Sequence, residues 1–175
     1  MRALFHLIKW LLILAVIAVG AAFVLGSALP ASNEASRATR LEVSRQAVYD
    51  VLNAPGNYAD WRTDVQRVEL LDADRFREYS GEEAVTFKIV ERFEPTRLVI
   101  AVDDPDVPFS GTWTFELQPE GAQGEFSRIR ITERSEVAHP IYRLMARVMI
   151  TPGEELEQYL HYLGRRFNQN VRIEP

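Results

Sequence analysis

The feature that most constrains this chain is an unbroken apolar run near its N-terminus. Residues 10–29 read WLLILAVIAVGAAFVLGSAL, and Ser27 carries the only polar side chain among them. Twenty residues of α-helix extend about 30 Å, which matches the hydrocarbon thickness of a bilayer. A buried helix of a soluble domain normally has a polar stripe, and this run has none. The sequence therefore predicts a transmembrane helix, with residues 1–29 as a membrane anchor.

A cleavable signal peptide is the main alternative for this segment. Signal peptides have apolar regions of about 7–15 residues that end at a small-x-small site, and residues 26–28 (GSA) fit such a site. The run is longer than that range, which favours a retained, single-pass anchor. Arg2 and Lys9 favour a cytoplasmic N-terminus, although Arg37 and Arg40 weaken the asymmetry. We therefore expect a cytoplasmic (inner) membrane protein with its domain on the extracytoplasmic side, and the cytoplasmic side stays open.

The charges of the chain divide at the same place. Residues 1–29 contain two basic side chains and no acidic ones, whereas residues 30–175 contain 18 Lys and Arg against 25 Asp and Glu. An acidic domain lacks the basic surface that neutralises phosphates, so no nucleic-acid partner is predicted. The chain has no cysteine, which excludes disulfide scaffolds, cysteine nucleophiles and thiolate metal sites.

Residues 30–36 (PASNEAS) read as a short polar linker in front of one domain at 37–175. Stretches such as 84–93 and 111–118 alternate apolar and polar side chains, as half-buried strands do. Short turns between such stretches predict an antiparallel meander with one dry face. The last third has helical spacing with a break near Thr151, and its apolar stripe is expected to cover the dry face of the sheet.

Three segments carry a resemblance to a known family. Residues 44–61 (SRQAVYDVLNAPGNYADW) are similar to the opening motif of the SRPBCC superfamily, the START-like, polyketide cyclase/dehydrase and lipid-transport proteins. Residues 108–121 (PFSGTWTFELQPEG) and 128–144 (RIRITERSEVAHPIYRL) resemble its later strands and the entry to its last helix. The resemblance implies an α+β helix-grip fold, with a curved antiparallel sheet wrapped around a long C-terminal helix and a hydrophobic cavity between them. Members bind lipids, sterols, polyketides or other apolar molecules, and some are enzymes.

Within that fold, strand parity and helical spacing select the residues expected to line the cavity. The ligand-cavity candidates are Trp61, Phe87, Ile89, Glu91, Ile100, Trp113, Phe115, Ile131, Glu133, Met145, Met149 and Tyr159. Glu91 and Glu133 share the parity of apolar neighbours, so each could point into the cavity or stand at its rim beside Arg62, Arg92 or Arg134. A solid core is the alternative for the whole set.

The sequence predicts no catalytic motif, no metal site and no cofactor. Ser110 lacks the G-x-S-x-G elbow, the acidic loop at 103–106 lacks calcium-loop spacing, and no glycine-rich phosphate loop occurs. We therefore expect a membrane-anchored START-like domain that binds a hydrophobic small molecule or lipid. Two alternatives stay open: a cyclase- or dehydratase-type enzyme with Glu91, Glu133 or Tyr159 as acid or base, and a protein-interaction module with a filled core. Protein partners stay unknown.

Overall fold

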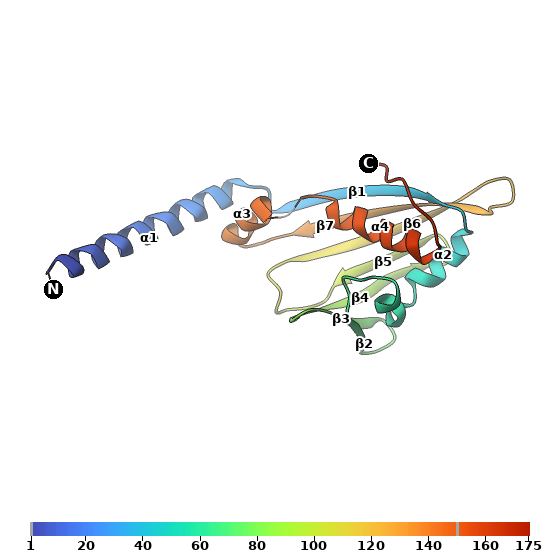
Figure 1. The fold of residues 1–175 in the computed structure, drawn as a ribbon, viewed down its shortest axis with the longest axis horizontal. Coiled ribbons are helices and arrows are strands. Elements are labelled where there is room, and N and C mark those ends of the chain that lie inside the picture. The colour runs from blue at the N-terminus through green and yellow to red at the C-terminus, as the bar shows by residue number, and fades with distance from the viewer. Residues whose placement is uncertain (1, 150) are drawn as a thin grey trace.

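The computed structural model describes residues 2–149 and 151–175. A long N-terminal helix, α1 (Arg2–Ala28), leads into a seven-stranded antiparallel sheet that is followed by two further helices (Figure 1). The strands are β1 (Ser32–Leu41), β2 (Arg67–Leu70), β3 (Arg75–Ser80), β4 (Glu83–Phe93), β5 (Arg97–Val102), β6 (Ser110–Glu120) and β7 (Phe126–Glu136). The sheet order is β1-β7-β6-β5-β4-β3-β2, so the first strand pairs with the last and the rest form a meander.

The sheet curves around helix α4 (Glu154–Arg166), and this arrangement is the predicted helix-grip fold. The leucines of α4 at 156, 160 and 163 recur on one helical face and are fully buried, as are Ile129 and Ile131 of β7. Helix α2 (Arg45–Leu52) and the short 3-10 helix η1 (Pro55–Asp60) close one end of the sheet. The Ser44 side chain caps α2 by accepting a hydrogen bond from the Ala47 amide.

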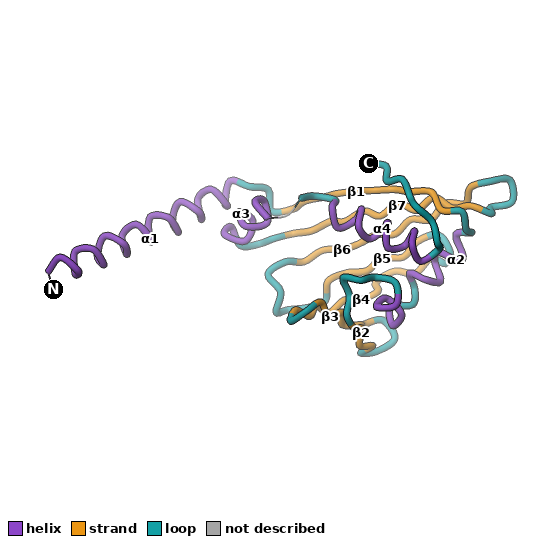
Figure 2. Tube along the Cα trace, viewed as in Figure 1, coloured by secondary structure: helices purple, strands orange, loops and turns teal. Residues whose placement is uncertain are grey.

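Helix α1 projects away from the sheet (Figures 1 and 2), and most of its described side chains are exposed. Its segment His6–Ala28 is long and apolar enough to cross a membrane, and almost none of it is buried against the domain. The predicted linker at 30–36 needs correction because β1 begins at Ser32 and pairs with β7 from its first residue. Only residues 29–31 therefore connect α1 to the sheet.

The C-terminal helix is broken where the sequence suggests a break. Helix α3 (Pro140–Met149) and helix α4 are separate, and Gly153 stands before α4 with a left-handed φ of 84° (Figure 2). The expectation that Met145 and Met149 face the sheet is wrong, because α3 packs against α1 instead. These methionine side chains are 48% and 76% exposed. The turn at Gly153 redirects the chain, so only α4 reaches the concave face.

Candidate ligand pocket

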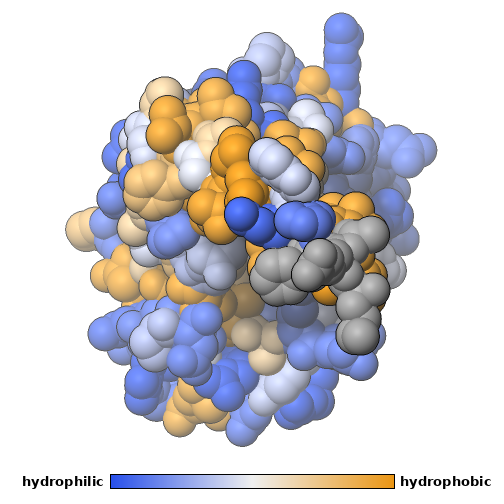
Figure 3. Space-filling model, turned by 90° about the vertical axis from the view of Figure 1, so that its left-hand side faces the viewer, coloured by the Kyte–Doolittle hydropathy of each residue, from blue (hydrophilic) through white to orange (hydrophobic). Residues whose placement is uncertain are grey.

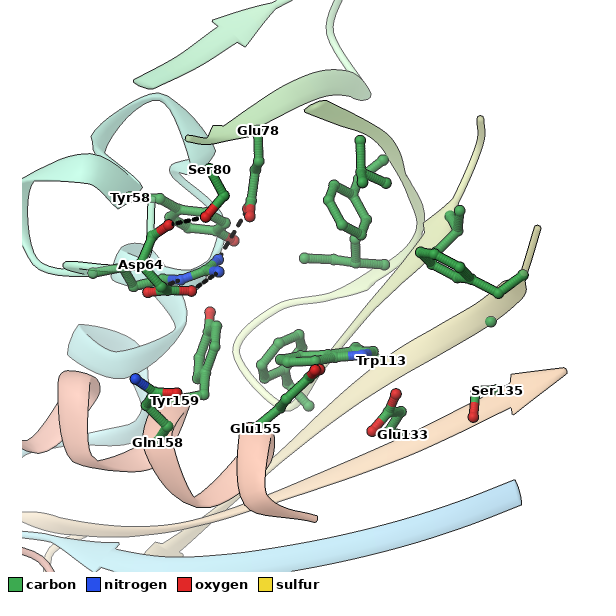
Figure 4. A pocket seen from close by; sticks show the side chains of 18 of the residues that line it. Tyr58, Asp64, Glu78, Ser80, Trp113, Glu133, Ser135, Glu155, Gln158 and Tyr159 are labelled. Atoms are coloured by element: carbon green, nitrogen blue, oxygen red, sulfur yellow. Dashed lines mark hydrogen bonds and ion pairs between the residues drawn. The ribbon is translucent and has the colours of Figure 1, made fainter. Parts of the chain in front are cut away.

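A pocket of about 390 Å³ lies between the concave face of the sheet and α4 (Figure 4). This volume lies in the range of sites for small molecules. Its walls come from η1 and the segment after it, from strands β3 to β7 and from α4. The lining residues are Tyr58, Arg62, Asp64, Phe76, Glu78, Ser80, Val85, Phe87, Ile100, Val102, Phe109, Ser110, Gly111, Trp113, Phe115, Glu133, Arg134, Ser135, Glu155, Gln158, Tyr159 and Tyr162.

Aromatic rings form most of the apolar wall, and Tyr159 lies among them. Its ring centroid is 5.5 Å from that of Trp113, 5.4 Å from that of Phe115 and 5.4 Å from that of Trp61. Contacts of this kind add about 0.5–1.5 kcal/mol per pair to the hydrophobic effect. The rings pack against one another and are rigid. They therefore hold the pocket open, because they cannot collapse into it as flexible side chains can.

One end of the pocket carries a buried ion cluster. The Arg62 guanidinium donates to Asp64 Oδ2 at 2.7 Å through Nη2 and to Glu78 Oε1 at 2.9 Å through Nη1. The Arg62 and Glu78 side chains are only 11% and 12% exposed. The guanidinium also lies over the Tyr159 ring, 5.1 Å from its centroid. Arg62 therefore joins η1 to β3 and α4 at the inner end of the pocket.

Burial and the attraction between opposite charges shift the pKa values of this cluster in opposite directions. Burial raises the pKa of Glu78, and the charge of Arg62 partly opposes that rise. Burial would lower the pKa of Arg62, but the carboxylates of Glu78 and Asp64 outweigh it and keep the guanidinium charged. Because two carboxylates already surround Arg62, the cluster offers a ligand no free positive charge.

The Tyr159 hydroxyl reaches toward Asp64 and Glu78 from α4 (Figure 4). The hydroxyl oxygen is buried and interacts with the Tyr58 hydroxyl, which itself donates to the Leu52 carbonyl oxygen. Burial raises the pKa of Tyr159 well above its ordinary range, so the hydroxyl keeps its proton. A buried hydroxyl of this kind usually has a partner, and here the Tyr58 oxygen can accept from it.

Two further carboxylates stand beyond Trp113. Glu133 of β7 is the cross-strand neighbour of Trp113, and Glu155 starts α4 on the facing side (Figure 4). Burial raises the pKa of Glu133, and the negative charge of Glu155 raises it further. The pocket thus has an apolar middle with hydrogen-bonding groups at both ends. Within residues 2–149 and 151–175, no group of three or more His, Cys, Asp or Glu side chains could hold a metal ion.

The sequence matches the family model described as polyketide cyclase / dehydrase and lipid transport over residues 34–156. That match spans most of the chain and nearly all of the sheet. The chain belongs to this family. No curated protein matches the sequence at a significant level.

Solved structures show the same fold at low sequence identity. A START superfamily protein from Mycobacterium smegmatis superposes with a TM-score of 0.61 at 15% identity, covering 76% of this chain and 95% of that one. A conserved protein from Geobacillus kaustophilus gives 0.63 at 11%, covering 82% and 100%. Truncated norcoclaurine synthase from Thalictrum flavum gives 0.64 at 11%, covering 79% and 95%. At these identities the likeness establishes the START-like fold and nothing about the ligand.

In this family member, half of the residues predicted for the cavity meet at the pocket. Those at its walls are Phe87, Ile100, Trp113, Phe115, Glu133 and Tyr159. Trp61, Ile89 and Ile131 lie instead in the solid core behind the walls. Strand parity places a side chain on the concave face but does not say whether another side chain covers it.

Glu91 lies outside the pocket, on the outer face of the sheet. A register shift between Ile89 and Glu91 makes Val90 an extra residue, which reverses the parity of the strand beyond it. Glu91 therefore pairs with Arg97, whose Nε lies 2.7 Å from Glu91 Oε1. Arg97 also pairs with Glu116, which points away from the core between Phe115 and Leu117.

The ion cluster of Arg62, Asp64 and Glu78 was not predicted from the sequence. We expected Arg62 at the rim, beside Glu91 or Glu133, but its partners are Asp64 and Glu78. Glu78 shares the parity of buried Phe76 on β3, and this alternation is a pattern that could have identified it. A buried carboxylate such as Glu78 requires a cation beside it. Arg62 is the candidate, because it follows directly after Trp61 and close to Tyr58, two aromatic residues expected in the interior.

Proposed function

We propose that this protein binds a hydrophobic small molecule or a lipid in the pocket between the sheet and α4. The observation that carries this proposal is the pocket of about 390 Å³, whose walls are mostly aromatic in the middle and carry carboxylates at both ends. An apolar molecule would cover the rings, and a polar group at its end would hydrogen-bond with the carboxylates at one end of the pocket. The open volume also argues against an interaction module with a filled core.

The charges that line the pocket restrict the ligand class. Arg62 is neutralised by its two carboxylates, and Arg134 Nε lies 2.7 Å from Glu34 Oε2. Glu133 and Glu155 add negative charge without a paired cation among the described residues. A carboxylate or phosphate on the ligand would therefore meet net repulsion. We expect an amphiphile whose polar end is uncharged or positively charged.

The proposal includes α1 as a retained, single-pass membrane anchor. Its support is an exposed apolar helix of sufficient length and a connection of only residues 29–31 to the domain. The few basic residues around the span favour a domain on the extracytoplasmic side of the cytoplasmic membrane. An apolar ligand would concentrate in the adjacent bilayer, so a short tether keeps the pocket near its source. The excess of acidic residues in the domain disfavours nucleic acid as a partner.

Mass spectrometry of molecules that co-purify with the full chain tests this function. Val85 lines the pocket on β4, whereas Val90 of the same strand is exposed on the other face, so the two valines form a matched pair. We expect wild type and Val90→Trp to retain the same bound amphiphile. Val85→Trp should lose it while its unfolding temperature stays close to that of Val90→Trp. An empty wild-type pocket, or equal loading of both variants, would refute the proposal.

An acid–base enzyme remains a second candidate because of Glu133. Its raised pKa and its place in the pocket wall are features of general acids. The molecules recovered from wild type and from Glu133→Gln distinguish the two functions. A cyclase or dehydratase would release product from the wild type and retain substrate in the variant, with a mass difference between them. A binding protein would yield the same molecule from both.

A further inference from the structure

We propose that α3 is an interfacial helix that lies in the plane of the membrane and holds the pocket entrance against the bilayer. The proposal rests on the proposed anchoring of α1 and adds a second membrane contact to it. The partner is an anionic lipid surface.

The exposed face of α3 is unusually apolar for a water-soluble domain. Val148 and Met149 are 78% and 76% exposed, and Tyr142 and Met145 are also exposed. Helix α3 packs against α1, which also exposes apolar side chains, and orange hydrophobic side chains gather at this end of the molecule (Figure 3). Contiguous apolar surface of this kind marks a contact site, and here it continues the surface of the membrane helix.

The charge of α3 fits a membrane rather than the domain to which it belongs. Residues 137–149 contain Arg143, Arg147 and His139 and no acidic residue, although residues 30–175 carry an excess of acid. Arg147 is exposed, while Arg143 donates to the carbonyl oxygens of Val137 and Ala138 at 2.7 Å each. Basic residues beside an apolar face are typical of helices that bind anionic bilayer surfaces.

The packing of α3 on α1 sets its depth. Gly26 leaves room for the Pro140 backbone, since a Cβ there would come within 1.9 Å of the Pro140 carbonyl oxygen. The Phe23 and His139 rings meet edge to face at 6.3 Å. Phe23 is about 9 Å along the helix axis from Leu29, at 1.5 Å per residue. If α1 spans the bilayer, α3 starts within the last two turns of the span, at the boundary of headgroups and acyl chains.

This position matters for the pocket because α3 leaves the sheet near the end of the pocket that the exposed residues Phe109 and Ser110 line. Ser110 and Ser135 line the pocket where β6 begins and β7 ends, and Ser110 pairs with Glu136. Only residues 137–139 separate β7 from α3. A seated α3 therefore brings this end of the sheet to the headgroup layer, and an apolar ligand would enter from the bilayer without crossing water.

Depth-dependent fluorescence quenching tests the proposal on the full chain, which is free of cysteine and accepts single labels. Val148→Cys carries an environment-sensitive dye on α3, Val16→Cys reports the α1 span, and Glu82→Cys reports the exposed β3–β4 turn. The labelled proteins are placed in nanodiscs of phosphatidylcholine and phosphatidylglycerol, with quenchers attached to lipids at shallow and deep positions. Nanodiscs of pure phosphatidylcholine test the role of lipid charge.

We expect the shallow quencher to act on Val148, the deep quencher to act on Val16, and neither to act on Glu82. Replacing Arg147 with Glu should reduce the quenching at Val148 at least severalfold, as should removal of phosphatidylglycerol. Quenching at Val16 without quenching at Val148 would overturn the proposal and leave the anchor intact. Absence of quenching at both sites would refute the anchor as well. A Val148 dye that neither the lipid-attached quenchers nor soluble iodide can reach would overturn it in favour of a protein contact.

Discussion

Arg62 is a buried cation whose removal leaves Glu78 in the interior without a partner. Breaking a buried pair by removing one member typically costs about 3–5 kcal/mol. We expect Arg62→Met to lower the free energy of unfolding by about that amount in urea titrations followed by tryptophan fluorescence. Arg97→Met is the matched control because Arg97 also pairs with two carboxylates, but on the outer face.

The control variant should lose less than about 1 kcal/mol, as exposed ion pairs do. Adding Glu78→Leu to Arg62→Met should restore part of the stability, because the unpaired carboxyl group is then absent. Equal losses from Arg62→Met and Arg97→Met would show that the inner cluster is not a buried pair.

Glu133 makes the stability of the domain depend on pH, and the direction of that dependence follows from its raised pKa. Its pKa is raised in the folded state by burial and by Glu155, so protonation of Glu133 favours folding. Its stabilising contribution is complete below the ordinary glutamate pKa of about 4.3 and is lost as the pH rises through the raised pKa. Glu133→Gln imitates the protonated form and should be more stable than wild type at pH 7, by less than about 1 kcal/mol because solvent screens a partly open site.

The stability difference between wild type and Glu133→Gln is measured by thermal unfolding of both proteins. The pH range is roughly 3.5 to 7, which begins near the ordinary glutamate pKa. The gap from wild type should close at the acidic end. Glu91→Gln removes an outer ion pair with Arg97 and should give no gain at pH 7. A stabilised Glu91→Gln, or a constant gap for Glu133→Gln, would contradict the assigned positions.

These two glutamates show how far sequence reasoning reaches at the residue scale. Both share the parity of apolar neighbours, yet Glu133 lines the pocket and Glu91 lies outside it. The difference comes from one extra residue at Val90 in the ladder between β4 and β5. A bulge of this kind depends on pairing with the neighbouring strand, so the sequence of β4 alone does not reveal it.

At the scale of elements, Gly153 determines the direction in which α4 leaves α3. It has φ of 84°, and a Cβ there would lie 2.7 Å from the Arg37 guanidinium carbon. Gly81 has φ of 65° with open space around it, so its replacement by alanine measures the cost of backbone strain alone. We expect Gly81→Ala to lose about 1–2 kcal/mol of unfolding free energy. Gly153→Ala should lose up to about 1 kcal/mol more, because displacing Arg37 weakens its ion pair with Glu157.

Urea titrations of the two alanine variants give the comparison directly. A smaller loss for Gly153→Ala than for Gly81→Ala would mean that the Arg37 contact contributes nothing. The break before α4 was predictable from the Thr-Pro-Gly-Glu sequence at 151–154. The direction of α3 was not, because the amphipathic pattern of 140–149 fits a sheet, a membrane surface or another helix equally well.

At the scale of the whole molecule, the sequence was sufficient for the fold. Alternating strands, the breaks between them and the motif at 44–61 predict a helix-grip domain, and the structure and the family model confirm it. The open volume was not predictable. It depends on whether rings such as Trp113 and Tyr159 support one another across the space, which is a property of three-dimensional packing.

We expect the pocket to bind an amphiphile whose polar end is uncharged or positively charged. Photolabelling of the full chain in nanodiscs tests it most directly, with a long-chain alcohol, amine and carboxylate that carry the same diazirine. We predict adducts on pocket residues of β4 to β6 from the alcohol and the amine, retained in Val90→Trp and lost in Val85→Trp. If the carboxylate probe labelled the pocket most strongly, or if labelling were unchanged in Val85→Trp, this assignment of the ligand would be contradicted.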